Sequence, residues 1–511
     1  MNTRRTFAFA AIIVVSIILA LSYLHHNFIW LLIIVLPLIV VGIVDIVQTR
    51  HTIRRNFPVI GNFRFILEKI RPEIMQYFVE TDTEGRPINR LSRSLIYQRA
   101  KKEIDTTPFG TQLNVYQDGY EWLDHSIYAL NNKDIEHHPR ILVGEKTCKQ
   151  PYSSSILNIS AMSFGALSKN AVLAMNAGAK MGNFAHNTGE GGISPYHIEP
   201  GGDLIWQIGT GYFGCRKDDG SFCPDLFQKH ASIDNVKMIE IKISQGAKPG
   251  HGGILPASKN TEEIAAIRHI PAHTDVHSPP GHSAFNNPEE LLHFVQQLRD
   301  LSGGKPVGFK LCIGKKQEFN NICEAIISTG IIPDFIAVDG GEGGTGAAPT
   351  EFSDSLGMPL RDGLAFVVDT LRGYNLKKDI KVIASGKVFS GFDIVRMLSI
   401  GADMVSSARA MMMAIGCIQA LQCNTNTCPV GVATQDKYLM KGLVVKDKSK
   451  RVANYHEETV KSFIDLMAAS GISKPSNISR IHINRRIAMN KVLKYNEIYP
   501  EVEEGAYLNQ F

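Results

Sequence analysis

The sequence of 511 residues lacks the compositional bias of disordered, collagen-like or coiled-coil chains. Charged residues make up only 20% and hydrophobic residues 44%, so there is enough apolar surface for a large packed core. An excess of one charge is also missing, because 54 Lys and Arg face 49 Asp and Glu and leave a net charge of +5. With no basic stripe either, the sequence argues against a nucleic-acid partner.

Paired cysteine motifs are absent as well. The eight cysteines show neither the C-x2-C spacing of ferredoxins nor the paired CxxC spacing of zinc sites. Three of them, Cys417, Cys423 and Cys428, are nevertheless close in sequence, and the turn Pro429-Val430-Gly431 can direct backbone donors at a sulfur ligand. Three thiolates suit an iron–sulfur cluster with one vacant corner, while a zinc site and buried, unreactive thiols stay open as alternatives.

Long hydrophobic runs occur in the first fifty residues. Residues 6–24 carry no charge, and a second apolar run starts at Phe28, so we predict two transmembrane helices at 6–24 and 28–47. Each is long enough, at 1.5 Å per residue, to cross a hydrocarbon core of about 30 Å. A cleaved signal peptide is the alternative, but no small-residue cleavage site follows the first run and a second run comes immediately.

Arginines flank this pair of runs. Arg4 and Arg5 precede the first run, and Arg50, Arg54 and Arg55 follow the second, which by the positive-inside rule places both ends in the cytoplasm. We therefore expect a membrane anchor (residues 1–50) in the cell (inner) membrane, with the catalytic domain facing the cytoplasm.

The remaining chain has two parts that differ in the periodicity of their apolar residues. Helical periodicity at residues 63–70 and 91–102 predicts an N-terminal helical wrap over 51–150. From about residue 155, short β-branched runs alternate with helix-length segments, which indicates an α/β fold, a (β/α)8 TIM barrel over 151–440 followed by a helical tail over 441–511. The expected strands are 156–160, 183–187, 238–243, 306–311, 335–338, 381–384 and 403–406, with a less certain eighth near 272–276.

Several expected strands end in glycine-rich or polar loops. In a barrel of this kind the active site lies at the C-terminal ends of the strands. The loops at 339–346, 384–387 and 406–409 can wrap backbone N–H groups around a phosphate, although glycines also mark tight barrel corners. Lys310 ends another strand, where a cation can stabilise the negative charge of a reduced flavin.

Taken in order, the motifs resemble a known family. Ser160-Ala-Met-Ser-Phe-Gly, Asn187-Thr-Gly-Glu-Gly-Gly, Lys242-Ile-Ser-Gln-Gly-Ala-Lys-Pro-Gly, Gly343-Gly-Thr-Gly and Cys428-Pro-Val-Gly resemble the FMN-binding synthase domain of glutamate synthases over roughly residues 110–440. The resemblance implies an FMN barrel that reduces 2-iminoglutarate, formed from 2-oxoglutarate and ammonia, to L-glutamate with electrons that pass through a 3Fe-4S cluster.

The resemblance also implies roles for individual residues. Glu190 and Lys242 would be catalytic, Gln245, Lys248 and Arg268 would bind the oxo acid, and Cys417, Cys423 and Cys428 would ligate the cluster. The FMN site would be formed by Met162, Ser163, Asn187, Lys310, Gly340, Gly341, Gly343, Gly344, Thr345, Gly346, Ser385, Gly386, Lys387, Ser407 and Ala408. The charged members of this set are the types that a dicarboxylate needs, although ion pairs that only stabilise loops are the alternative.

The sequence departs from the family in two ways. After Lys248-Pro249-Gly250 the family usually continues with Glu and, three residues later, Gln, whereas this chain has His251 and Ile254, which leaves the substrate open. An N-terminal cysteine nucleophile with its amidotransferase domain is not found. We therefore expect ammonia from solution or from a separate amidotransferase subunit, and electrons from a ferredoxin-like protein or a membrane redox partner.

Three functions are compatible with these features. The leading hypothesis is a membrane-anchored FMN and 3Fe-4S oxidoreductase that aminates 2-oxoglutarate, and a variant of it acts on another substrate. The other is an electron-transfer subunit without substrate chemistry, which the retained cations around Glu190 argue against. A hydroxy-acid oxidase barrel has less support, because it needs no cysteine cluster.

Overall fold

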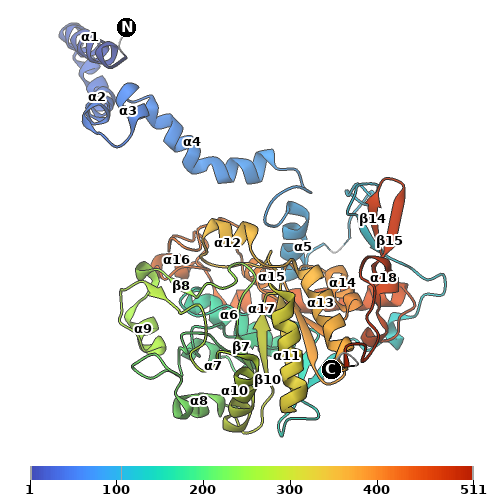
Figure 1. The fold of residues 1–511 in the computed structure, drawn as a ribbon. Coiled ribbons are helices and arrows are strands. Elements are labelled where there is room, and N and C mark those ends of the chain that lie inside the picture. The colour runs from blue at the N-terminus through green and yellow to red at the C-terminus, as the bar shows by residue number, and fades with distance from the viewer. Residues whose placement is uncertain (1–2, 105, 509–511) are drawn as a thin grey trace. The chain divides into compact units, whose positions relative to one another are not determined.

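The computed structural model describes residues 3–104 and 106–508, which form two compact units. The smaller unit ends at Arg86 and the larger begins at Pro87. Figure 1 shows the larger unit as a barrel of strands surrounded by helices. Each unit is described separately below.

The larger unit is built on a closed barrel of eight parallel strands, which confirms the predicted fold. Around the barrel the strands follow the order β10-β11-β12-β13-β4-β5-β6-β7. Their bounds are β4 Leu157–Ile159, β5 His186–Asn187, β6 Leu204–Ile208, β7 Val236–Lys242, β10 Val307–Leu311, β11 Phe335–Asp339, β12 Lys381–Ser385 and β13 Met404–Ser407. The register Val405↔Leu157 between β13 and β4 closes the ring.

One strand of the barrel differs from the sequence prediction. The eighth strand is β6, Leu204–Ile208, which pairs with β5 and β7. The segment expected near 272–276 lies outside the barrel, and β9 (Val276–His277) pairs antiparallel with β8 (Ile254–Leu255) in a small two-stranded sheet. The sequence prediction for this strand was wrong: residues 272–276 include the polar His273, Thr274 and Asp275, whereas β6 is a mostly apolar, fully buried run. Its place in the ring depends on pairing with β5 and β7, which periodicity does not reveal.

The barrel interior changes from apolar to polar toward the C-terminal ends of the strands. Residues two apart face the same side, so Met238 and Glu240 share the interior with Lys242 at the end of β7. The lower interior is a cluster that includes Ile205, Met238, Phe335, Ala337, Ile383 and Met404. Polar side chains, including Lys310 and Asp339, follow at the C-terminal ends of the strands. Strand register therefore determines which polar side chains lie at this end of the barrel.

Helices cover the outside of the barrel and extend beyond it. They are α6 Lys169–Gly182, α7 Pro195–Ile198, α8 Pro224–Ala231, α9 Glu262–Arg268, α10 Pro288–Leu301, α11 Lys316–Thr329, α12 Thr350–Ser355, α13 Leu360–Gly373, α14 Gly391–Ile400, α15 Arg409–Ala414, α16 Lys437–Lys441 and α17 Val445–Ala469. Outward side chains such as Trp206 and Phe309 are buried in the main hydrophobic core. This burial is the largest stabilising contribution to the fold.

The segments before and after the barrel are only partly helical. Helix α5 (Arg90–Lys101) follows the predicted periodicity, but β1 (Glu121–Leu123) then pairs with the hairpin of β14 (Ile483–Ala488) and β15 (Lys491–Lys494). A short α18 (Tyr495–Ile498) follows. A second hairpin, β2 (Arg140–Val143) with β3 (Tyr152–Ser155), places Val143 and Tyr152 in the lower apolar cluster of the barrel.

The smaller unit contains two apolar helices, α1 (Thr3–Leu24) and α2 (Leu32–Val47), joined by a 3-10 turn. With that turn the second span covers His26–Val47, so each of the two is long and apolar enough to cross a membrane. Helices α3 (Thr52–Asn56) and α4 (Gly61–Ile74) follow. Helix α4 confirms the periodicity noted at residues 63–70.

Candidate active site

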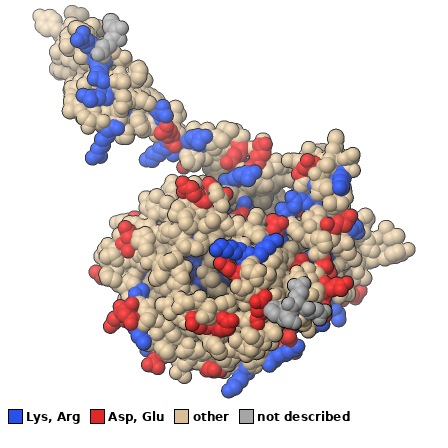
Figure 2. All heavy atoms as spheres, in the orientation of Figure 1, with Lys and Arg blue, Asp and Glu red and all other residues tan. Residues whose placement is uncertain are grey.

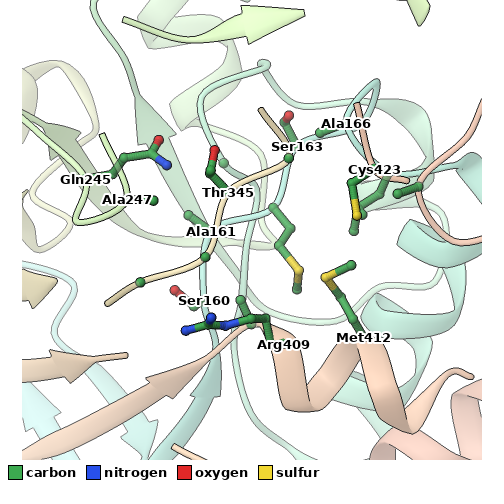
Figure 3. A pocket seen from close by; sticks show the side chains of 18 of the residues that line it. Ser160, Ala161, Ser163, Ala166, Gln245, Ala247, Thr345, Arg409, Met412 and Cys423 are labelled. Atoms are coloured by element: carbon green, nitrogen blue, oxygen red, sulfur yellow. The ribbon is translucent and has the colours of Figure 1, made fainter. Parts of the chain in front are cut away.

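A cavity of about 550 Å³ opens at the C-terminal rim of the barrel. Figure 3 shows side chains from separate loops around it, among them Ser163, Gln245, Thr345, Arg409 and Cys423. Most of the site residues predicted from sequence line it: Met162, Ser163, Glu190, Lys242, Gln245, Lys248, Arg268, Lys310, Gly343, Gly344, Thr345, Gly346, Ser385, Gly386, Lys387, Ser407, Ala408, Cys417, Cys423 and Cys428. The structure therefore brings residues more than 250 positions apart into one site.

Glu190 and Lys242 form an ion pair in this cavity. Lys242 Nζ donates to Glu190 Oε1 at 2.7 Å, with only 8% and 17% of the two side chains exposed. Burial by itself would raise the pKa of Glu190, but the charge of Lys242, with smaller contributions from Lys248 and Arg268, holds it below the usual value. Glu190 is thus an ionised base at neutral pH.

Two further cations point into the same region. Arg268, at the end of α9, donates through Nη2 to Phe164 O at 3.1 Å, while its buried Nε has no hydrogen-bond partner among the described residues. Burial lowers the pKa of Arg268 to about 10 and that of Lys248 to about 8. Desolvated cations with a spare donor favour an anionic ligand, because a bound carboxylate would restore the lost solvation.

Lys310 lies deeper in the cavity beside a carboxylate. Its Nζ is 3.4 Å from Asp339 Oδ2, and both side chains are more than 90% buried. Burial alone would lower the pKa of Lys310, but Asp339 and Glu240 outweigh it, so the pKa is raised and the lysine stays charged. Asp339 Oδ2 also accepts from the backbone N–H of Gly246 at 2.9 Å, which ties the loop after β7 to β11.

Backbone from the loops after β11, β12 and β13 lines the cavity where sequence predicted a phosphate site. Gly386 has φ +148°, a conformation that favours glycine, and a Cβ there would meet Leu360 at 3.3 Å. The loop from Gly343 to Gly346 and residues Ser407 and Ala408 line the same cavity. Glycine loops with Lys310 nearby are the donor set that an FMN phosphate and isoalloxazine need, so these residues fit the group.

Three residues expected around FMN are not among those that line the cavity. Asn187 does not line the cavity, because its Nδ2 donates to Glu240 Oε1 at 2.8 Å inside the barrel. Gly340 and Gly341 also do not line it, since their N–H groups donate to Ser385 O and Met358 O. Their role in the structure is to connect neighbouring loops.

The three clustered cysteines lie on the same cavity. All three line its wall, and burial, with smaller contributions from Cys423 and Cys428, raises the pKa of Cys417 to about 12. Cys417 Sγ accepts from the backbone N–H of Gln419 at 3.5 Å. Among residues 3–104 and 106–508, no three His, Cys, Asp or Glu side chains are arranged to hold a metal ion. Cys428 is buried and Cys417 and Cys423 are partly buried, so the three supply the thiol ligands that an iron–sulfur cluster uses but are not in a ligating arrangement here.

Sequence reasoning missed Lys259, which lies between the segment after β4 and the loop that carries the three cysteines. Only 2% exposed, its Nζ donates to three carbonyls: Ala166 at 2.7 Å, Cys423 at 3.1 Å and Ala433 at 3.2 Å. Burial lowers its pKa to about 8, against the opposite influence of Cys423 and Cys428. No motif marks this lysine, because its three partners come from distant segments.

Comparison with known proteins agrees with this geometry. Residues 111–473 match the conserved region in glutamate synthase. The chain is 38% identical over 492 residues to the glutamate synthase large subunit-like protein YerD of Bacillus subtilis, covering 88% of this chain and 93% of that protein. The chain belongs to the glutamate synthase family.

Other relatives are matched over a shorter part. The archaeal glutamate synthase (NADPH) of Methanocaldococcus jannaschii is 36% identical over 320 residues, which cover 62% of this chain and 59% of that protein. Among solved structures, mandelate oxidase Y128F aligns at a TM-score of 0.44 and 13% identity over 72% of this chain and 88% of that chain. Glutamate synthase family membership and the closed barrel together support an oxidoreductase of the glutamate synthase type.

Proposed function

We propose that the barrel binds FMN and a 3Fe-4S cluster and converts 2-oxoglutarate and ammonia to L-glutamate through 2-iminoglutarate. The observation that supports this most is the group of Glu190, Lys242, Lys248 and Arg268 on one cavity with the glycine loops. When bound, FMN would supply the hydride, and the cluster would carry single electrons from the external donor. Ser385, Gly386, Lys387, Ser407 and Ala408 would hold its phosphate, and Cys417, Cys423 and Cys428 would hold the cluster.

The residues of the chain would act on the substrate. Arg268 and Lys248 bind its carboxylates, which places the oxo carbon in the cavity. Glu190, kept ionised by Lys242, accepts a proton from the ammonium-derived nitrogen as water leaves and the C=N bond forms. Hydride addition to the imine carbon and a proton on the nitrogen then give the amine. Two electrons from an external donor balance each turnover.

Partners and location form part of the same proposal. The two apolar helices anchor the chain in the cell membrane, with flanking arginines on the cytoplasmic side, and the barrel acts in the cytoplasm. Ammonia arrives from solution or from a separate amidotransferase subunit. The electron donor is a ferredoxin-like protein or a membrane redox partner.

A different 2-oxo acid is the second candidate, and one residue favours it. Ile254 lines the cavity, so an alkyl chain faces the substrate at the position where related sequences have an amide. Loss of that hydrogen-bonding group costs about 1–3 kcal/mol if its partner on the substrate stays buried. A substrate with a less polar side chain would avoid this cost.

One experiment separates these candidates. The purified full-length protein is analysed for FMN, iron and sulfide, then reduced anaerobically and mixed with ammonia and 2-oxoglutarate. We expect flavin reoxidation and L-glutamate only when both are present, and no reaction in the Lys242→Met variant. Reoxidation by another 2-oxo acid instead would favour the second candidate. Reduced flavin left unoxidised by every 2-oxo acid would refute the proposed reaction.

A further inference from the structure

Helix α4 exposes its apolar side chains instead of burying them. Phe63, Ile66, Leu67 and Ile70 are 64%, 54%, 54% and 41% exposed. They are spaced three or four residues apart and therefore share one face of the helix. A stable helix in water normally turns such a face toward a core, so this face requires an apolar partner.

The other side of α4 is already occupied. Phe65 lies 4.8 Å from the ring of His51 and 4.2 Å from the guanidinium of Arg54, and Gly61 approaches the backbone of Arg54. Phe65 therefore attaches α4 to the short helix α3. The exposed apolar face points away from this contact.

The start of α4 is fixed to the end of the second apolar helix. The carboxylate of Asp45 in α2 is buried, and its Oδ2 accepts from Val59 N–H at 2.9 Å and from Asn62 Nδ2 at 2.6 Å. Arg4 Nε donates to Arg55 O at 3.0 Å, which brings the beginning of α1 to the same end. If α1 and α2 cross a membrane, α4 begins at its cytoplasmic boundary.

The direction of α4 suits a position along that boundary. Figure 1 shows α4 leaving the α1–α2 pair as a separate helix, and α3 lies between α2 and α4 in the chain. Because α4 does not continue the second apolar helix, it is free to follow the membrane surface. The apolar face of α4 can therefore extend the membrane contact that we propose for α1 and α2.

Charge in this unit favours an anionic surface. Residues 50–74 contain the bases Arg50, Arg54, Arg55, Arg64, Lys69 and Arg71 against the acids Glu68 and Glu73. Blue Lys and Arg atoms dominate the charged surface of this unit in Figure 2. Arg64 and Arg71 are seven residues apart and border the apolar face. Arg64 Nε donates to Glu68 Oε1 at 3.1 Å in an exposed ion pair, which is weak enough for the guanidinium to reach a lipid phosphate as Arg71 can.

We propose that α4 is an interfacial helix whose apolar face enters the cytoplasmic leaflet and whose arginines contact anionic lipid headgroups. The proposal depends on the membrane anchoring put forward above and is independent of the reaction. It gives the segment between the anchor and the barrel a lipid partner. A second copy of the chain is the competing occupant.

The test uses the full-length protein in nanodiscs with 30% or no anionic lipid. The photoreactive residue p-benzoylphenylalanine replaces Ile66 on the apolar face, Glu68 on the opposite face, or Ile34 within α2. After illumination, mass spectrometry measures lipid adducts and gel electrophoresis measures protein dimers. We expect at least about fivefold more lipid adduct at Ile66 than at Glu68, more of it with anionic lipid, and adducts at Ile34 in both discs.

Each other outcome counts against the proposal. Adducts at Ile34 with equal, low yields at Ile66 and Glu68 would overturn the interfacial helix and leave the anchor intact. Dimers in place of lipid adducts at Ile66 would identify a second copy as the partner. Absence of adducts at Ile34 would overturn the anchor, and the interfacial helix with it, without affecting the proposed reaction.

Discussion

Replacing Lys242 by Met is expected to destabilise the barrel because it leaves Glu190 without its partner. The two groups are 2.7 Å apart and mostly buried, and burial alone would raise the pKa of the carboxyl. Removing one partner of a buried ion pair typically costs about 3–5 kcal/mol, because the remaining charge has lost both water and its counterion. Lys242→Met and Glu190→Gln should each show a loss of this size.

The expected change in melting temperature follows from the size of the unit. For roughly 400 residues the unfolding entropy is about 0.9 kcal/mol/K, so a loss of 3–5 kcal/mol lowers Tm by about 3–6 °C. Methionine and glutamine have nearly the volume of the residues they replace. The double variant Glu190→Gln/Lys242→Met contains no buried charge at either position and should recover most of the lost stability.

The assay is a double-mutant cycle of thermal unfolding at one scan rate, with activity measured in parallel. We expect the double variant to be close to the wild type in Tm yet inactive, which separates the stabilising role of the pair from its chemical role. Strictly additive losses of Tm would show that Glu190 and Lys242 do not interact in the folded protein. Full activity in the double variant would remove Glu190 from the mechanism.

Three other predictions test separate parts of the barrel. Lys259→Met removes the donor shared by three carbonyls around the cysteine loop and should lower the iron content severalfold; unchanged iron would contradict the positioning role. Gly246→Ala puts a Cβ 1.6 Å from Gly340 O and should lower both Tm and FMN content, whereas Gly314→Ala, with nothing within 4 Å, should change neither; equal effects would refute the steric argument. Burial lowers the pKa of His186 to about 3 from 6.5, so the unfolded chain binds the proton first and stability falls as pH drops from 6.5 toward 3; a Tm-versus-pH curve should become flatter in His186→Phe, and identical slopes would contradict this.

Most of the barrel was predictable because its strands obey local rules. The runs that contain Met238–Lys242 and Val307–Leu311 are apolar, β-branched and followed by polar or glycine-rich loops, so sequence located both strand and rim. The prediction failed for Leu204–Ile208, because whether a short apolar run joins the ring depends on its neighbours β5 and β7.

The site residues also divide into those that a local motif locates and those whose orientation depends on neighbouring strands. Cys417, Cys423 and Cys428 form a recognisable local pattern, and all three line the cavity. Asn187 belongs to an equally clear motif, yet it points to Glu240 inside the barrel. Side-chain direction at a strand end depends on register with adjacent strands, which a motif does not contain.

The sequence by itself determined the apolar helical pair, the alternation of strands and helices, and the family to which the chain belongs, because each is written in residue types at short spacing. Only the tertiary structure decided which run closes the ring, that Lys259 contacts three separate loops, and that Asp45 fastens α4 to α2. These contacts join positions distant in sequence, and their energy depends on burial and geometry that exist only after the chain has folded.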